Sequence, residues 1–105
     1  MTLFTPKHFC AEIKDGIARI AHDRPDRKNP FTFDSYAEFR DWFRALAYAD
    51  DVHAVAILPN GGNFSSGGDV HDIIGPLTHM SMTELLNFTR MTGDLVKAMI
   101  GCRKP

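Results

Sequence analysis

The chain has 105 residues, with 12 Lys or Arg, 13 Asp or Glu, 5 His and 2 Cys. This length fits one small domain with a modest core, and 44% hydrophobic and 24% charged residues exclude intrinsic disorder and a disulfide scaffold. The net charge of −1 gives no electrostatic footprint for nucleic acid or for an anionic membrane surface.

The first predicted elements are two strands joined by a tight turn. Apolar and polar side chains alternate loosely over residues 8–14, and residues 16–21 form a second short apolar run. The dipeptide Asp15-Gly16 between them is a strong hairpin signal. We therefore predict that the chain opens with a β-hairpin.

An amphipathic helix is predicted after a polar loop. Residues 22–32 are polar and contain two prolines, which is typical of a loop. From Phe33 to Ala49, apolar residues recur at three- and four-residue steps, as on one face of a helix. The hydroxyl of Thr32 is expected to cap its first turn.

A buried strand and a second helix follow. Residues 52–58 form a short, mostly apolar run with three β-branched side chains, which is typical of a buried parallel strand. A turn and a loop are expected over residues 69–76. Ser81 and Glu84 then form a capping box, and helical spacing continues to Gly101, which we predict to stop the helix.

The predicted order β-β-α-β-α defines the α/β class, with strands that are partly parallel. No basic leader precedes a long apolar run, and no stretch approaches the ~18 apolar residues of a membrane span. Cys10 and Cys102 form no CxxC pair and are expected to be free thiols. We therefore expect a cytoplasmic protein with no membrane partner.

A glycine-rich loop follows the third strand, at the sheet edge where α/β proteins bind ligands. It holds four glycines in residues 59–68. Gly62 and Gly67 have the spacing of a phosphate-binding loop. Gly68 and Asp69, however, stand where that loop requires Lys and then Ser or Thr, which argues against a nucleoside triphosphate site.

Two other interpretations of this loop remain. Neither Ser65 nor Ser66 has the GxSxG frame of a serine nucleophile, so serines that satisfy backbone groups in a turn are favoured. The third interpretation is an oxyanion hole, because Gly67-Gly68 lets backbone amides approach a ligand with no intervening Cβ.

Several motifs resemble those of the enoyl-CoA hydratase/isomerase (crotonase) superfamily. Residues 64–69 (FSSGGD) are similar to its FxxGxD element, and residues 53–62 (HAVAILPNGG) to the strand that enters this element. Residues 17–29 (IARIAHDRPDRKN) resemble its second strand and the loop after it. The resemblance covers about residues 8–104 and depends on the order and spacing of the motifs.

This resemblance implies repeated β-β-α units, with residues 1–105 as the N-terminal part of a single crotonase-like domain, assembled as a homotrimer or hexamer. It implies an acyl-CoA thioester as substrate, so that coenzyme A enters with the substrate and no separate cofactor is expected. The amide of Gly68 is implied as one of two donors to the thioester carbonyl oxygen. The second donor and the acid/base residues are expected beyond Pro105.

The resemblance also implies further substrate-binding residues in the loop: Ser66, Gly67 and Asp69. Three basic residues fall in a segment that resembles the one lining the CoA nucleotide: Arg24, Arg27 and Lys28. A solvated loop is an equally good interpretation of these three. No metal site is predicted, because Asp69-Val-His71-Asp72 lacks a recognised ligand spacing.

The predicted function is acyl-CoA binding and enolate stabilisation through a backbone oxyanion hole, of the enoyl-CoA hydratase/isomerase type. The motifs do not distinguish among the individual reactions of the superfamily. The alternative is a catalytically inactive CoA-binding or oligomerisation module that lacks the downstream acid/base residues. An intact mass well above 11.8 kDa would favour the longer enzyme.

Overall fold

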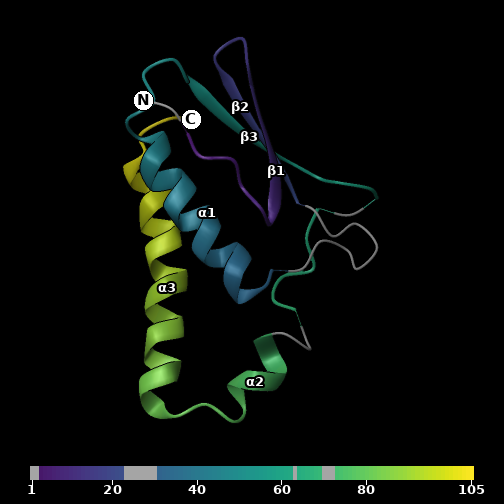
Figure 1. Cartoon of the computed structure of the whole chain (residues 1–105), viewed down its shortest axis with the longest axis vertical. Helices are drawn as coiled ribbons and strands as arrows, with labels where there is room; N and C mark the ends of the chain where they lie inside the picture. Colours follow the sequence, from purple (N-terminus) through teal and green to yellow (C-terminus); the bar gives the residue numbers. More distant parts are fainter. Residues whose placement is uncertain (1–2, 23–30, 63, 70–72) are drawn as a thin grey trace.

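The computed structural model describes residues 3–22, 31–62, 64–69 and 73–105. A three-stranded sheet of order β1-β2-β3 packs against α1, and α1 packs in turn against the long helix α3 (Figure 1). The elements, in chain order, are β1 (Phe9–Lys14), β2 (Ile17–His22), α1 (Phe33–Leu46), β3 (Ala54–Leu58), α2 (Gly75–Leu77) and α3 (Met82–Gly101). The α/β class and the alternation of strands and helices are confirmed.

The predicted hairpin is present. Asp15 and Gly16 both have positive φ, 54° and 78°, which the tight turns that join two strands require. β1 pairs antiparallel with β2, whereas β2 pairs parallel with β3, with Ala18 opposite Val55. The partly parallel sheet is therefore confirmed.

Helix α1 begins where the sequence predicts and ends earlier. The Ser35 amide donates to the Thr32 hydroxyl at 3.2 Å, and the Thr32 amide donates to the Ser35 hydroxyl at 2.8 Å. The helix ends at Leu46, because the amides of Tyr48 and Ala49 bond to carbonyls three residues back, which tightens the chain into turns. The predicted end at Ala49 is therefore wrong by three residues.

Helix α3 has the predicted capping box, in which the Ser81 amide donates to the Glu84 carboxylate and the Glu84 amide to the Ser81 hydroxyl. The predicted stop at Gly101 is wrong. Gly101 is still helical, Cys102 is the C-cap, and Arg103 takes the left-handed position with φ 56°. The extra residue places the buried Cys102 in the core, which the shorter helix would not do.

The residues after α3 return to the other elements. The Lys104 ammonium donates to the carbonyl oxygens of Ala49 and, at 2.7 Å, of Val52, in the turn between α1 and β3. The Val55 amide of β3 donates to the Pro105 carbonyl at 2.8 Å. The end of α3 is therefore fixed to both α1 and the sheet.

Two further predictions need correction. The strand predicted as buried over residues 52–58 is shorter and mostly half-buried, and Leu58 is 40% exposed, because β3 is an edge strand. Gly75 and Pro76, predicted as the end of a loop, instead begin the short helix α2 (Gly75–Leu77), which has this proline in its first turn.

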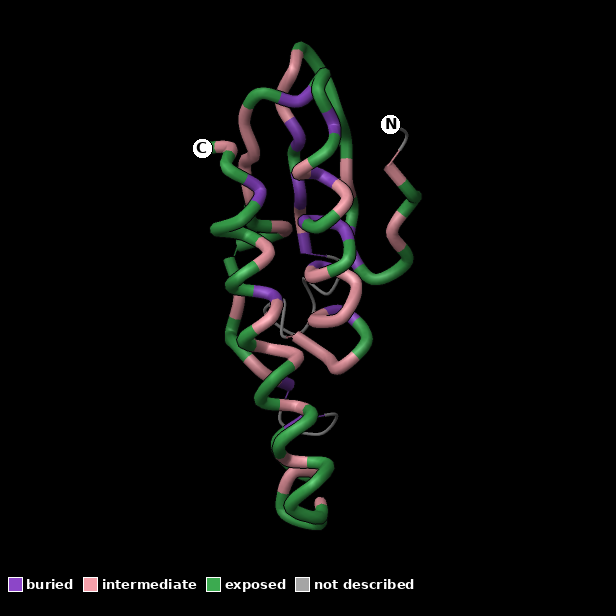
Figure 2. Tube along the Cα trace, turned by 90° about the vertical axis from the view of Figure 1, so that its left-hand side faces the viewer, coloured by how far each residue is buried: buried purple, intermediate pink, exposed green. Residues whose placement is uncertain are grey.

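The core lies between the sheet and α1. The Phe9 ring of β1 packs on Phe39 and Trp42 of α1, with ring centroids 4.3 and 5.8 Å apart. Buried residues concentrate there, whereas the start of α3 is mostly exposed (Figure 2). Over the described part of the chain, no helix is both long and apolar enough to cross a membrane. The rigid core thus supports the strand ends from which the glycine-rich loop leaves.

Candidate functional site

The glycine-rich loop leaves the carboxyl end of β3 and is attached at once to β2. The Asn60 side-chain amide donates to the His22 carbonyl, the last of β2, at 2.7 Å. Gly61 follows with φ 81°, a conformation that favours glycine. The loop therefore begins at a fixed point of the sheet.

Backbone bonds to Phe31 hold the far end of the loop. The Phe31 amide donates to the Gly67 carbonyl at 2.6 Å, and the Asp69 amide donates to the Phe31 carbonyl at 2.7 Å. Together these bonds form a parallel bridge between Phe31 and Gly68. Phe31, two residues before the start of α1, thus bonds to both sequence neighbours of Gly68.

The bridge leaves the Gly68 amide unused. In extended backbone, successive N–H groups point to opposite edges, so the Gly68 N–H points away from Phe31. No acceptor among the described residues receives a hydrogen bond from it. The geometry therefore presents one backbone donor whose partner must come from elsewhere.

The two adjacent glycines have different requirements. Gly67 has φ 88°, which strains any residue with a Cβ, and its amide donates to the Ser65 hydroxyl at 3.2 Å. A Cβ on Gly68 would lie 3.8 Å from methyl groups of Ile73 and Ile74, an ordinary contact. Only Gly67 needs to be glycine for its own conformation, and the turn interpretation of Ser65 is supported.

Asp69 is the buried polar residue of the loop, at 3% exposure. Its carbonyl accepts from the amides of Ile73 and Ile74 at 2.9 and 3.0 Å, so its backbone joins the loop to α2. The backbone of Asp69 therefore braces the end of the loop. His71 and Asp72 lie outside the described residues.

The structure brings together Ser66, Gly67, Gly68 and Asp69 in one loop, with Ser66 and Gly67 exposed. The predicted nucleotide-binding residues Arg24, Arg27 and Lys28 lie outside the described residues. All of these assignments remain predictions.

An aromatic cluster next to the loop escaped the sequence analysis. The His22 ring is buried and contacts Phe31 and Phe64, whose centroids lie 4.9 and 5.6 Å away. Burial lowers the pKa of His22 and raises the pKa of Tyr36, which stacks on Phe31 at 4.5 Å. No local pattern connects residues this far apart in sequence, so the sequence carries no signal for the cluster.

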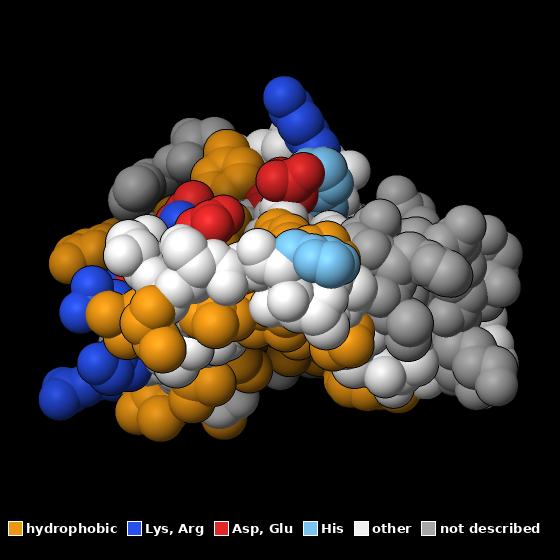
Figure 3. Space-filling view, turned by 90° about the horizontal axis from the view of Figure 1, so that it is seen from below, with side chains coloured by type: hydrophobic (Ala, Val, Ile, Leu, Met, Phe, Trp, Pro, Cys, Tyr) orange, Lys and Arg blue, Asp and Glu red, His pale blue; other side chains and the backbone are white. Residues whose placement is uncertain are grey.

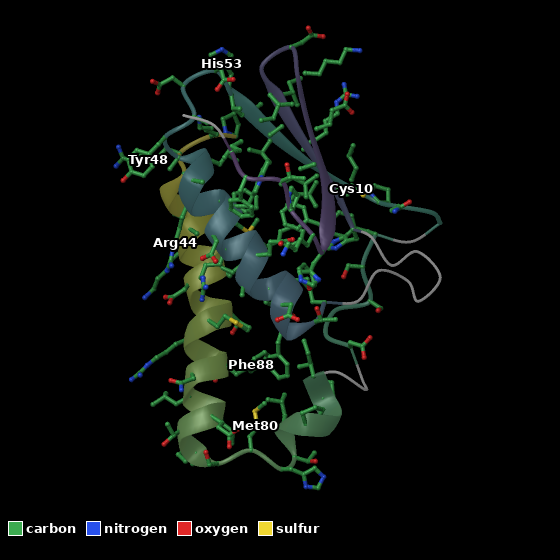
Figure 4. The ribbon with its side chains drawn as sticks, viewed as in Figure 1. Cys10, Arg44, Tyr48, His53, Met80 and Phe88 are labelled. Atoms are coloured by element: carbon green, nitrogen blue, oxygen red, sulfur yellow. The ribbon has the colours of Figure 1, made fainter. Side chains whose placement is uncertain are left out.

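An apolar surface lies at the α2 end of the molecule. Phe88 of α3 packs edge-on against Phe33 of α1 at 5.2 Å, and Met80 points toward the same space between α2 and α3 (Figure 4). Seen from that end, hydrophobic side chains form a broad band (Figure 3). This surface therefore lies beside α2 and the first half of α3 (Figure 4).

No protein-family model matches the chain. A Mycobacterium bovis protein named "Probable enoyl-CoA hydratase echA12" is 33% identical over 76 residues, which are 72% of this chain and 25% of that protein. The chain therefore spans about a quarter of the length of this curated relative.

Solved structures of enoyl-CoA hydratases are also similar to this chain. A Streptomyces coelicolor A3(2) protein assigned as an enoyl-CoA hydratase is 41% identical and superposes with a TM-score of 0.89 over 94% of this chain and 36% of its own. An enoyl-CoA hydratase from Shewanella pealeana ATCC 700345 has a TM-score of 0.87 at 20% identity, over 94% of this chain and 37% of its own, and shows the shared fold. The chain belongs to the enoyl-CoA hydratase/isomerase (crotonase) superfamily.

Proposed function

We propose that this chain binds an acyl-CoA thioester and stabilises an enolate through the backbone N–H of Gly68, in a reaction of the enoyl-CoA hydratase/isomerase type. One observation carries the proposal. The bridge to Phe31 consumes the Gly67 carbonyl and the Asp69 amide and leaves the Gly68 N–H directed away from it. An amide fixed in this way costs no reorganisation when charge develops on a carbonyl oxygen.

The surroundings of Gly68 favour this role. Ile73 and Ile74 flank it, and such apolar neighbours lower the local dielectric, which strengthens a hydrogen bond to a developing anion. Because the donor is a backbone N–H, the hydrogen bond does not depend on the protonation state of a side chain. The acyl chain would lie along the apolar surface that begins at these residues.

Other contacts of the substrate belong to the same proposal. Ser66, Gly67 and Asp69 would line the thioester and the adjacent part of CoA, and Arg24, Arg27 and Lys28 would meet its phosphates. The whole protein would work as a cytoplasmic homotrimer or hexamer, with its acid/base residues and second oxyanion donor supplied beyond Pro105.

Binding measurements on Gly68 variants test the donor. Crotonyl-CoA and CoA share the nucleotide but differ in the acyl group, so the ratio of their Kd values by titration calorimetry reports the carbonyl contact together with the burial of the acyl chain. Gly68→Pro removes the N–H and leaves the acyl chain unchanged. We expect it to lower the ratio by about two- to tenfold, as the loss of one neutral hydrogen bond would.

Gly68→Ala is the matched control. It keeps the amide, and its Cβ fits at 3.8 Å from the nearest atoms, so the ratio should stay at the wild-type value. Equal affinity of the wild type for both ligands, or an unchanged ratio in Gly68→Pro, would contradict the proposal.

Turnover separates the enzyme from the inactive module. Loss of one oxyanion donor lowers kcat by about 10²–10³, so Gly68→Pro should slow hydration of crotonyl-CoA by that factor in the protein that carries this chain. Tight binding of crotonyl-CoA without any turnover by the wild type would instead establish the CoA-binding module.

A further inference from the structure

His22 is a buried histidine with an unsatisfied nitrogen. It is the last residue of β2, and its side chain lies in the interior at 5% exposure. In the part of the chain that the structure describes, its Nε2 atom has no hydrogen-bond partner. A buried polar atom of this kind costs about 1–3 kcal/mol, so an apolar residue would stabilise the core better unless the imidazole has a use.

Rings from three separate segments surround the imidazole. Phe31, which precedes α1, and Phe64, in the glycine-rich loop, both meet it edge-on at 87°, with centroids 4.9 and 5.6 Å away. Phe39 of α1 lies at 5.6 Å with a 32° tilt. Phe64 is 52% exposed, so this part of the ring cluster lies at the surface.

Two of these ring contacts connect His22 to the backbone around Gly68. Phe31 carries the two hydrogen bonds that bracket Gly68, and Phe64 stands four residues before it. The Asn60 side chain, at the start of the loop, donates to the carbonyl of His22 itself. His22 thus contacts the start and the middle of the glycine-rich loop, and Phe31, to which the far end of the loop is bonded.

We propose that His22 is a positioning residue for the glycine-rich loop: its neutral imidazole, wedged between the rings of Phe31 and Phe64, holds the loop so that the Gly68 amide is presented. Protonation of the ring opens this contact. The connection to a ligand rests on the proposed acyl-CoA function, whereas the connection to the loop does not.

Among the described residues, the rings that contact the imidazole carry no charge: Phe39 of α1, Phe31 before it and Phe64 of the loop. Two titratable groups of α1 have other partners. The Tyr36 ring stacks on Phe31, and the Glu38 carboxylate accepts hydrogen bonds from the amides of Lys7 and His8. In the loop, Asp69 is the buried acidic residue. On β1 and β2, the charged Glu12, Lys14 and Arg19 are exposed.

The sign of the pH effect follows from burial, which lowers the pKa of His22 below the 6.5 of an exposed histidine. The open loop therefore binds the proton more readily than the closed loop. The closed form is fully favoured above pH 6.5 and loses stability as the pH falls below that value. At one unit below the pKa of the open form, the opening constant rises by up to about tenfold.

Amide hydrogen exchange tests the inference without any ligand. The reporters are the Asp69 and Phe31 amides, whose acceptors are Phe31 and Gly67, and the Leu85 amide at the start of α3 is the internal control. After correction for intrinsic rates, protection of both reporters should fall from pH 7.5 to pH 5.5, by up to about tenfold, with Leu85 unchanged.

Two variants with no titratable ring make the test independent of one substitution. In His22→Phe and His22→Leu, the reporters should keep their pH 7.5 protection at pH 5.5, so these variants exceed the wild type at low pH. His79→Gln alters an exposed histidine and should behave as the wild type. A pH response that survives in a folded His22 variant, or is absent from the wild type, overturns the inference.

Ligand binding adds a second readout. The affinity for crotonyl-CoA should fall with the reporters in the wild type and stay constant in His22→Phe. If crotonyl-CoA binds to no variant at pH 7.5, the proposed function fails, and the exchange data still decide the role of His22.

Discussion

The two long helices differ sharply in how they are packed. α1 buries five of its 14 residues, whereas α3 buries one, Leu95, of its 20. The reason is position, because α1 lies between the sheet and α3, and α3 has a described neighbour along one side only (Figure 1). The stability of the chain should therefore depend on α1 far more than on α3.

α3 carries a second apolar row that this neighbour does not cover. Its large members are all exposed: Met82, Leu86, Val96 and Ile100. With Thr89 and Gly93 between them, these positions recur at alternating steps of four and three residues. Apolar residues with helical spacing thus occur on two faces of α3. The spacing alone does not indicate which face packs against α1.

Trp42→Ala should give the largest effect. Its ring is buried against Phe9, and its Nε1–H donates to the Phe4 carbonyl at 3.1 Å, so truncation leaves a cavity and an unpaired acceptor. We expect a loss of about 3–5 kcal/mol in the free energy of unfolding, measured by urea titration followed by circular dichroism. Val96→Ala on α3 is the control and should change it by less than about 0.5 kcal/mol. Comparable losses in both variants would refute the contrast between the helices.

Lys104→Met should give the next largest effect. The Lys104 ammonium holds the carbonyls of Ala49 and Val52 after α1, and Met leaves both without this donor. The expected loss is about 1–3 kcal/mol in the same titration. Lys97→Met, on an exposed site of α3, should be close to neutral. If the two lysines prove equivalent, the link between the end of α3 and α1 contributes nothing to stability.

Gly67→Ala and Gly68→Ala compare two adjacent residues. At φ 88°, Gly67 pays about 1–2 kcal/mol for a Cβ, whereas Gly68 accepts one in ordinary contact. Gly67→Ala alone should lower the free energy of unfolding and reduce the protection of the Asp69 amide from hydrogen exchange. A larger loss at Gly68 would mean that the bridge to Phe31 sets a different conformation.

The fold could be predicted where the signal is local. The Asp15-Gly16 turn, the Thr32 cap and the Ser81–Glu84 capping box each need only a few adjacent residues, and all are present. The errors arise where tertiary contacts decide. Burial of Cys102 carries α3 past Gly101, and the edge position of β3 leaves it half exposed.

The candidate site also has one part that the sequence predicts and one part that it does not. The glycine-rich loop can be predicted because the glycines themselves are the signal. The resemblance to the family depends on the same residues. The contacts that hold the loop come from Phe31, His22 and Asn60, which are up to 38 residues apart. Such contacts depend on strand pairing and leave no periodic signal.

The ion pair between α1 and α3 should give the smallest effect. Arg44 and Asp94 lie 3.6 Å apart, with side chains 55% and 39% exposed, so water and salt screen their attraction. Asp94→Asn should cost less than about 0.5 kcal/mol at low salt and nothing measurable in high salt. A double-mutant cycle with Arg44→Gln isolates the pair from the Arg44–Asp41 contact. A coupling above about 1 kcal/mol would mean that charge, rather than apolar packing around Leu95 of α3, holds the two helices together.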